Sequence, residues 1–123
     1  LKVDLHMHTV NSDGDVSPRM RVMEAFVEGL DAIAITDHQP AFGKPDGWDY
    51  DQSYTQALNE AKNRDILLIR GMEISHNQTD IGHINVLFVK DPNEVVKLNQ
   101  KKLNPQLSVL HISRIIQRLY LTI

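Results

Sequence analysis

The sequence predicts an α/β protein with a mainly parallel β-sheet. Four short apolar runs, at residues 2–7, 32–36, 66–70 and 84–89, have the length and composition of strands. Segments with helical spacing of apolar residues separate the first three runs, and the connections are short. This order favours parallel strands joined by right-handed crossovers.

The opening run ends in a pair of histidines. If residues 2–7 form a strand, His6 and His8 point to the same side, about 6 to 7 Å apart along the backbone. Two neutral imidazoles on a rigid strand can present their lone pairs to one metal ion. The spacing alone supports an accidental pair equally well. The turn-forming residues 9–15 include Asp13 and predict a loop that leaves the carboxyl end of the strand.

Capping residues and apolar spacing define the next elements. Ser17 and Pro18 predict the start of a helix over residues 18–29. The continuously apolar run 32–36 is typical of a central parallel strand, and it places Asp37 and His38 at the strand's carboxyl end.

A loop over residues 39–53 is rich in Gly, Pro and Asp, and its aromatic side chains predict either a wall of a substrate site or hydrophobic anchoring. A helix over 51–63 and a buried strand over 66–70 follow, and this strand leads to Glu73. His83 stands directly before the fourth strand. Helical patterns then cover 90–103 and the stretch after Pro105, where we expect His111 to be a surface histidine.

Composition and charge restrict the kinds of function that the chain can have. The chain has 123 residues, enough for one domain but well short of the roughly 250 residues of a complete β/α barrel. It has no Cys, so any metal ion must bind through nitrogen and oxygen. Residues 1–89 carry seven Lys/Arg against fourteen Asp/Glu, while residues 90–123 carry six against two. The acidic part favours cation binding over a nucleic-acid surface, and there is no long apolar stretch that would cross a membrane.

Ionisable side chains follow successive predicted strands. The carboxyl ends of parallel strands meet at one edge of a sheet, so we expect these side chains to gather there. The candidate metal ligands are His6, His8, Asp13, His38, Glu73 and His83. Such a rim predicts two or more divalent cations, with the Glu73 carboxylate able to bridge a pair.

The segments Asp4–Thr9 with Asp13-Gly14, Ile35–His38, Gly71–Ile74 and Gly82-His83 closely resemble the PHP domain, the polymerase and histidinol phosphatase superfamily. The resemblance covers roughly residues 2–92. It implies the N-terminal part of a distorted (β/α)7 TIM-like barrel with a centre of two or three divalent ions of zinc, manganese or iron.

The resemblance also implies roles for single residues. His6 and His8 would bind a first ion, Glu73 would bridge it to a second ion that His83 also binds, and Asp13 and His38 would bind a third. Asp4 and Asp37 would orient imidazoles, although for Asp37 the capping of a helix or loop is an open alternative.

The family's later motifs, an Asn-His-Pro-like turn and a final Asp-x-His pair, are missing. We therefore expect the N-terminal part of a longer protein, with residues 1–92 forming PHP-like metal-binding units and residues 93–123 forming a helical tail of the same domain. An incomplete ligand set also predicts that this chain alone is catalytically silent.

The expected reaction is hydrolysis of a phosphomonoester by a metal-bridged water, with a small phosphorylated substrate and no nucleic-acid or membrane partner. His76 is the candidate acid for the leaving group, and an exposed loop histidine is the alternative. Two other functions stay open: a non-catalytic domain that metal stabilises for folding or partner docking, and an amidohydrolase-type metal hydrolase. We expect a soluble protein, cytoplasmic or, if an upstream signal was removed, periplasmic.

Overall fold

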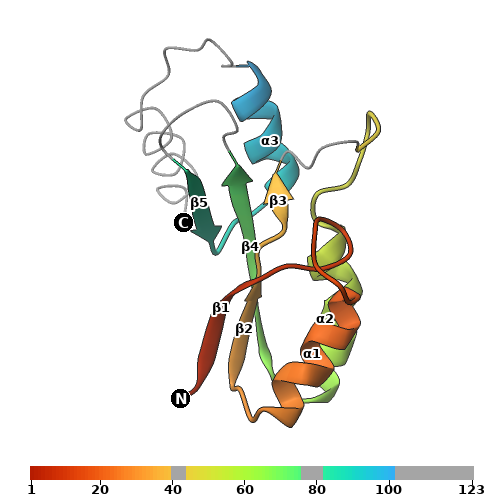
Figure 1. The fold of residues 1–123 in the computed structure, drawn as a ribbon, viewed down its shortest axis with the longest axis vertical. Coiled ribbons are helices and arrows are strands. Elements are labelled where there is room, and N and C mark those ends of the chain that lie inside the picture. Colours follow the sequence, from red (N-terminus) through yellow and green to blue (C-terminus); the bar gives the residue numbers. More distant parts are fainter. Residues whose placement is uncertain (40–43, 76–81, 102–123) are drawn as a thin grey trace.

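The computed structural model describes residues 1–39, 44–75 and 82–101. Its elements in chain order are β1 (Val3–Met7), α1 (Pro18–Val27), β2 (Ala32–Ile35), β3 (His38–Gln39), α2 (Gln52–Asn63), β4 (Leu67–Ser75), β5 (His83–Leu87) and α3 (Pro92–Lys101). The strands form one mixed sheet in which β1 pairs with β2, and β4 pairs with β2, β3 and β5 (Figure 1). The predicted α/β class with a mainly parallel sheet is confirmed, and the arrangement is consistent with part of a TIM-like barrel.

The strand β3 continues β2 after a break at Thr36 and Asp37. β2 pairs in parallel with β4 from Ala32 opposite Leu67, and β3 resumes the same register with His38 opposite Glu73. β4 is thus longer than the predicted strand 66–70, because it runs on through Glu73. This extension places Glu73 inside the sheet.

The strand β5 differs from the other strands in direction. It pairs antiparallel with β4, with His83 opposite Ser75. Only seven residues, 76–82, separate these two strands in the sequence, and antiparallel neighbours can be joined by a short connection. The fourth strand was predicted over 84–89, and the structure starts it one residue earlier, so that His83 belongs to the ladder.

The helices cover one face of the sheet, while the opposite face carries a small buried apolar cluster of Ala32, Ala34 and Ile69 as well as polar groups. α1 and α2 lie side by side over β2 and the first half of β4, and α3 lies beside the second half of β4 (Figure 1). The buried side chains between the helices and the sheet form two clusters: Val22, Ala25, Ile33, Ile35, Ala57, Ala61, Ile66 and Leu68 where α1 and α2 meet the sheet, and Met72, Ile74, Val86, Val89, Val95 and Val96 where α3 meets it. Glu73 and Ser75 alternate with Met72 and Ile74, so they face the opposite side.

Helix α1 starts as predicted, because the Ser17 side chain accepts a hydrogen bond from the Met20 N–H and Pro18 occupies the first turn. Among the residues that the structure describes, no helix is both long and apolar enough to span a membrane. The predicted helix after Pro105, with His111, lies outside the described residues.

Candidate metal centre

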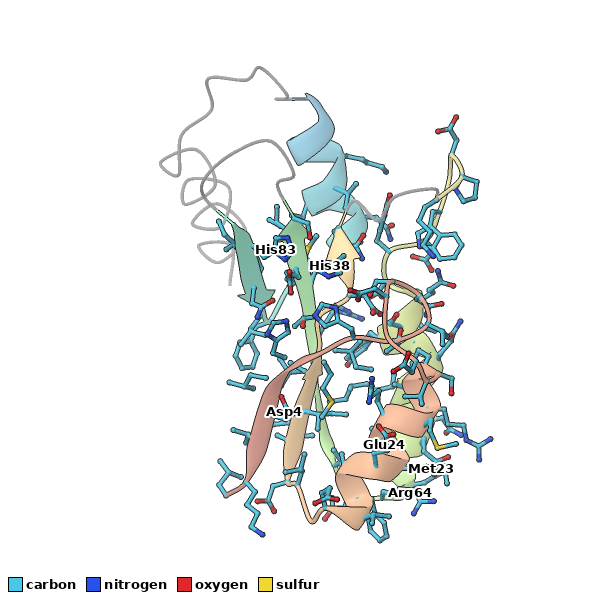
Figure 2. All side chains as sticks on the ribbon, viewed as in Figure 1. Asp4, Met23, Glu24, His38, Arg64 and His83 are labelled. Carbon is cyan, nitrogen blue, oxygen red and sulfur yellow. The ribbon has the colours of Figure 1, made fainter. Side chains whose placement is uncertain are left out.

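Glu73 lies at the centre of the candidate site. Its side chain is only 2% exposed, and both carboxylate oxygens face imidazoles. Oε2 lies 2.8 Å from His6 Nε2 and 3.3 Å from His8 Nε2. Oε1 lies 3.1 Å from His38 Nδ1 and also contacts His83 Nδ1. His38 and His83 reach Glu73 from β3 and β5, the two strands that flank β4 (Figure 2).

The first donor group consists of His6, His8 and Glu73. The two Nε2 atoms lie 2.8 Å apart, which confirms that the opening histidines converge. The register between β1 and β2 shifts by one residue after Asp4, and such a bulge re-aims the side chains that follow it. Donor atoms about 2.0–2.1 Å from one ion lie roughly 2.8–3.4 Å from one another. The three separations within this group, 2.8, 2.8 and 3.3 Å, fall in that range.

Two further donor groups share residues with the first. His8, Asp13 and His38 form an outer group, in which Asp13 Oδ1 lies 3.3 Å from His8 Nδ1 and Oδ2 lies 3.2 Å from His38 Nε2. His38, Glu73 and His83 form the remaining group. The four rings form a continuous row, with centroid separations of 4.9, 4.5 and 5.0 Å. All six residues predicted from the sequence as ligands therefore come together.

The chemistry of these donors fits divalent cations. His8 Nδ1 and Glu73 Oε1 are buried, and although Asp13 and two imidazoles face them, neither atom makes a well-aligned hydrogen bond among the described residues. This arrangement is costly, and a bound cation would relieve it. Burial, and then the neighbouring His38 ring, lowers the pKa of His8, which favours the neutral ring that can donate a lone pair to a metal ion. Burial raises the pKa of Asp13, but the imidazoles of His38 and His8 outweigh it and hold the pKa below its ordinary value.

Asp4 and Asp37 do not contact imidazoles in the described parts of the chain, contrary to the role that the resemblance implied. Asp4 Oδ1 accepts a hydrogen bond from the His6 backbone N–H at 3.0 Å. Asp37 accepts hydrogen bonds from Thr9, Ser12 and Ser53. The alternative interpretation of Asp37, as a group that holds a loop, is the one that the structure supports.

The sequence did not indicate several residues that support the donors. Ser75 Oγ lies 2.6 Å from His38 Nδ1, and a longer predicted strand would have found it, because it is two positions after Glu73. The Arg21 guanidinium donates a hydrogen bond to the His8 carbonyl at 2.8 Å. At Gly14 a Cβ atom would lie 2.4 Å from the same carbonyl oxygen, so only glycine lets the loop pass this close.

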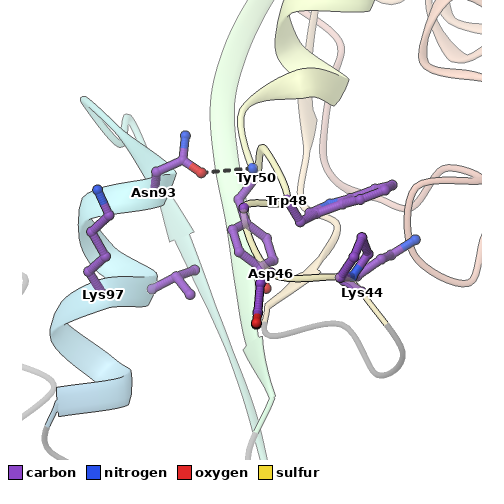
Figure 3. A pocket seen from close by; sticks show the side chains of 9 residues that line it. Lys44, Asp46, Trp48, Tyr50, Asn93 and Lys97 are labelled. Atoms are coloured by element: carbon purple, nitrogen blue, oxygen red, sulfur yellow. Dashed lines mark hydrogen bonds between the residues drawn. The ribbon is translucent and has the colours of Figure 1, made fainter.

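The loop over 44–50 lies apart from the donor row and lines a cavity of about 190 Å³ against α3 (Figure 3). Tyr50 packs against the core beneath α3, and its N–H donates a hydrogen bond to Asn93 Oδ1 at 2.8 Å. These contacts favour an anchoring role for Tyr50, while Trp48 lines the cavity. Phe42 and the candidate acid His76 lie outside the described residues.

The fold and the donor row define a class: α/β proteins with the fold of PHP-like metal-dependent phosphoesterases and amidohydrolases. A family model for the PHP domain matches residues 4–118, and the chain belongs to this family. The resemblance seen in the sequence is thereby confirmed.

Known relatives agree with this assignment. The chain is 32% identical over 109 residues to a 5'-3' exoribonuclease of Haemophilus influenzae, a match that covers 89% of this chain and 32% of the relative. It is 37% identical, with a TM-score of 0.70, to a two-domain protein of Bacteroides vulgatus that contains a predicted PHP-like metal-dependent phosphoesterase; 83% of this chain and 32% of that one are covered.

An amidohydrolase of Chromobacterium violaceum, solved with bound sulfate and no metal, shares the fold, with a TM-score of 0.64, 24% identity and coverage of 84% of this chain and 33% of the other. The chain thus spans about a third of the length of each of these proteins.

Proposed function

We propose that this chain carries the donor residues of a metal-dependent phosphoesterase centre that hydrolyses phosphomonoesters. The observation that supports this most strongly is the sharing of Glu73, whose carboxylate belongs to two of the three donor groups: Oε2 faces His6 and His8, and Oε1 faces His38 and His83. Sharing brings adjacent cations close together, and closely spaced cations are suited to an in-line displacement at phosphorus.

The chain's own residues divide among the proposed ions. His6 and His8 hold one ion with Glu73, His83 and Glu73 hold a second, and Asp13 and His38 hold a third. When bound, the cations would activate water as a nucleophile and neutralise charge on the phosphoryl oxygens. Nitrogen and oxygen donors suit zinc, manganese and iron alike.

The non-ligating contacts keep the donors in place. Ser75 bonds to His38 at Nδ1, and Arg21 binds the carbonyl of His8. Such outer contacts fix ring orientation and typically change metal affinity about 10- to 100-fold when they are removed.

A second candidate function is hydrolysis of RNA from its 5' end, because the Haemophilus influenzae relative is named an exoribonuclease. The acidic body of the chain, with fourteen Asp/Glu against seven Lys/Arg over residues 1–89, argues against an extended nucleic-acid surface. A phosphomonoester therefore remains our first choice. A metal-stabilised domain without catalysis, or an amidohydrolase, would also account for the donor residues. Neither would hydrolyse a phosphomonoester or RNA, so hydrolysis assays separate them from the two candidates above.

The test is metal analysis combined with hydrolysis. Protein freed of metal by chelation and reloaded with Zn²⁺, Mn²⁺ or Fe²⁺ is assayed on an aryl phosphate, a bis(aryl) phosphate and a 5'-phosphorylated oligoribonucleotide. We expect bound metal, and chelation should abolish any turnover of the monoester. Turnover of the oligoribonucleotide alone supports the second candidate. Bound metal with no hydrolysis is expected both of a non-catalytic domain and of a chain with an incomplete ligand set, so that outcome supports the metal centre alone.

We also propose His76 as the proton donor to the leaving group. A good leaving group needs little protonation, so His76→Ala should slow hydrolysis of an alkyl phosphate far more than that of a nitrophenyl phosphate. Equal losses with both substrates would contradict this role.

A further inference from the structure

Asp37 is a buried carboxylate that is fully occupied by hydrogen bonds. It is 4% exposed. Oδ1 accepts from the Thr9 N–H and from Ser12 Oγ, both at 2.6 Å. Oδ2 accepts from Thr9 Oγ1 at 2.7 Å and from Ser53 Oγ at 2.5 Å. Hydrogen bonds to an ionised acceptor are the strong ones, so Asp37 is a firm anchor for whatever segment it holds.

The segment that most needs an anchor is the loop of Asp13. The Asp13 side chain is 64% exposed, so burial does not determine where its carboxylate lies. Ser12, the residue before it, joins the loop to Asp37, and Ser12 Oγ also lies 3.3 Å from Asp13 Oδ1. The loop is compact, because the N–H groups of Ser12 and Gly14 both donate to the Thr9 carbonyl at 2.9 Å.

Asp37 also meets the segments of two other donors. Its carbonyl accepts a hydrogen bond from the Glu73 N–H at 3.1 Å, and it directly precedes His38. A single residue is thus tied to the segments that carry Asp13, His38 and Glu73.

We propose that Asp37 is a positioning residue that sets the place of Asp13 through Ser12, and so controls the outer donor group of His8, Asp13 and His38. This inference rests on the proposed metal centre. It gives Asp37 a different task from orienting an imidazole, and it makes Ser12 the link whose loss affects the outer ion alone.

The chain offers a matched pair of variants. Ser12→Ala and Ser53→Ala each remove one hydroxyl that donates to Asp37, but Ser12 directly precedes Asp13. Ser53 lies in the first turn of α2 and reaches the loop of Asp13 only by accepting a hydrogen bond from Asn11 Nδ2 at 2.9 Å. If Asp37 were only a structural group, the two variants would have the same effect on metal binding. Ser12→Thr keeps the hydroxyl and serves as the rescue variant.

The experiment measures Zn²⁺ and Mn²⁺ stoichiometry and affinity by equilibrium dialysis, and the absorption spectrum of the Co²⁺-loaded protein. We expect Ser12→Ala to raise the Kd of the most weakly bound ion about 10- to 100-fold and to change the Co²⁺ spectrum. Ser53→Ala should change both far less than Ser12→Ala does, and Ser12→Thr should restore them. Asp37→Asn, as a second variant, should behave as Ser12→Ala does. Thermal unfolding of the metal-free variants confirms that they fold.

The outcomes separate this inference from the proposed function. Equal effects of Ser12→Ala and Ser53→Ala, or no effect of Ser12→Ala, overturn the positioning role while the wild-type protein still binds metal. A wild-type protein that binds neither Zn²⁺, Mn²⁺ nor Co²⁺ overturns the proposed function and the positioning role with it.

Discussion

Glu73 and Asp13 are both carboxylates that face imidazoles of the donor groups, but one lies in a buried strand and the other in an exposed loop. Each carboxylate uses both oxygens to face imidazoles. The Glu73 oxygens lie 2.8–3.3 Å from ring nitrogens of His6, His8 and His38, and the Asp13 oxygens lie 3.2–3.3 Å from those of His8 and His38. Glu73 is 2% exposed and lies within β4, paired on both sides by β3 and β5. Asp13 is 64% exposed and lies in a loop.

The difference shows two ways of placing a donor. The β-ladder holds Glu73, so its carboxylate can move only if the sheet opens. Asp13 depends on the hydroxyl of Ser12 and on a tight turn, which can open without unfolding the domain. We therefore expect the ions at Glu73 to bind more tightly than the ion at Asp13.

The largest expected effect is that of Glu73→Ala. This change removes the carboxylate from two of the three donor groups at once. Metal content should fall to at most one equivalent, and any phosphoesterase turnover should be lost. Elemental analysis after dialysis measures the first and aryl phosphate hydrolysis the second. Glu60→Ala is the control, since Glu60 is a largely buried carboxylate that binds arginines instead of imidazoles; two or more ions retained by Glu73→Ala would contradict its central place.

A smaller effect is expected for Asp13→Ala. Only the outer donor group contains Asp13, so one ion should weaken while the ions at Glu73 stay bound. Titration of the metal-free protein with Zn²⁺, followed by calorimetry, resolves the separate affinities. If Asp13→Ala abolished all binding, as Glu73→Ala is expected to, the proposed ranking of the two carboxylates would be wrong.

Sequence reasoning succeeded where local periodicity carries the information. Alternation along β1 predicted that His6 and His8 converge, and the apolar runs predicted which strands deliver His38 and Glu73 to one edge. The ends and directions of the strands were harder to predict from the sequence. Glu73 lies inside β4 and β5 is antiparallel, because pairing with neighbouring strands, and not composition, decides where a strand ends.

The supporting contacts could not be predicted in this way. Ser12, Thr9 and Ser53 meet Asp37 across 25, 28 and 16 residues of chain. No period or spacing links a hydroxyl in a loop, a hydroxyl in a helix and a carboxylate after a strand. Such partners become visible only when the fold brings them together.

The substitution Gly14→Ala tests whether the tight turn of the loop determines the position of Asp13. A Cβ atom in Gly14→Ala would lie 2.4 Å from the His8 carbonyl oxygen, so the loop must move away. We expect a loss of about 1–3 kcal/mol in the free energy of unfolding, with weaker binding of the outer ion only. At Gly29, after α1, φ is +69° and nothing lies within 4 Å of an added Cβ, so Gly29→Ala strains only the local backbone. Gly29→Ala should therefore lower stability in denaturant titration without this selective loss of metal.

The smallest effect is expected from a substitution of Glu60. Unlike Glu73 and Asp13, this carboxylate contributes to the stability of the fold and not to the donor groups. It accepts hydrogen bonds from Arg64 Nε at 2.5 Å and Arg19 Nε at 2.9 Å, and these bonds, that of Arg64 first, lower the pKa of Glu60. A lowered pKa in the folded state means that the contribution to stability is present above the ordinary value near 4.5 and is lost as the pH falls through the folded-state pKa. Glu60→Gln should slightly lower the Tm at neutral pH and leave it nearly unchanged in acid, with no change in metal content. Thermal scans from neutral to acidic pH, beside the same scans of Glu24→Gln, measure this; a pH-independent loss would show that packing, and not the ionised carboxylate, stabilises this helix pair.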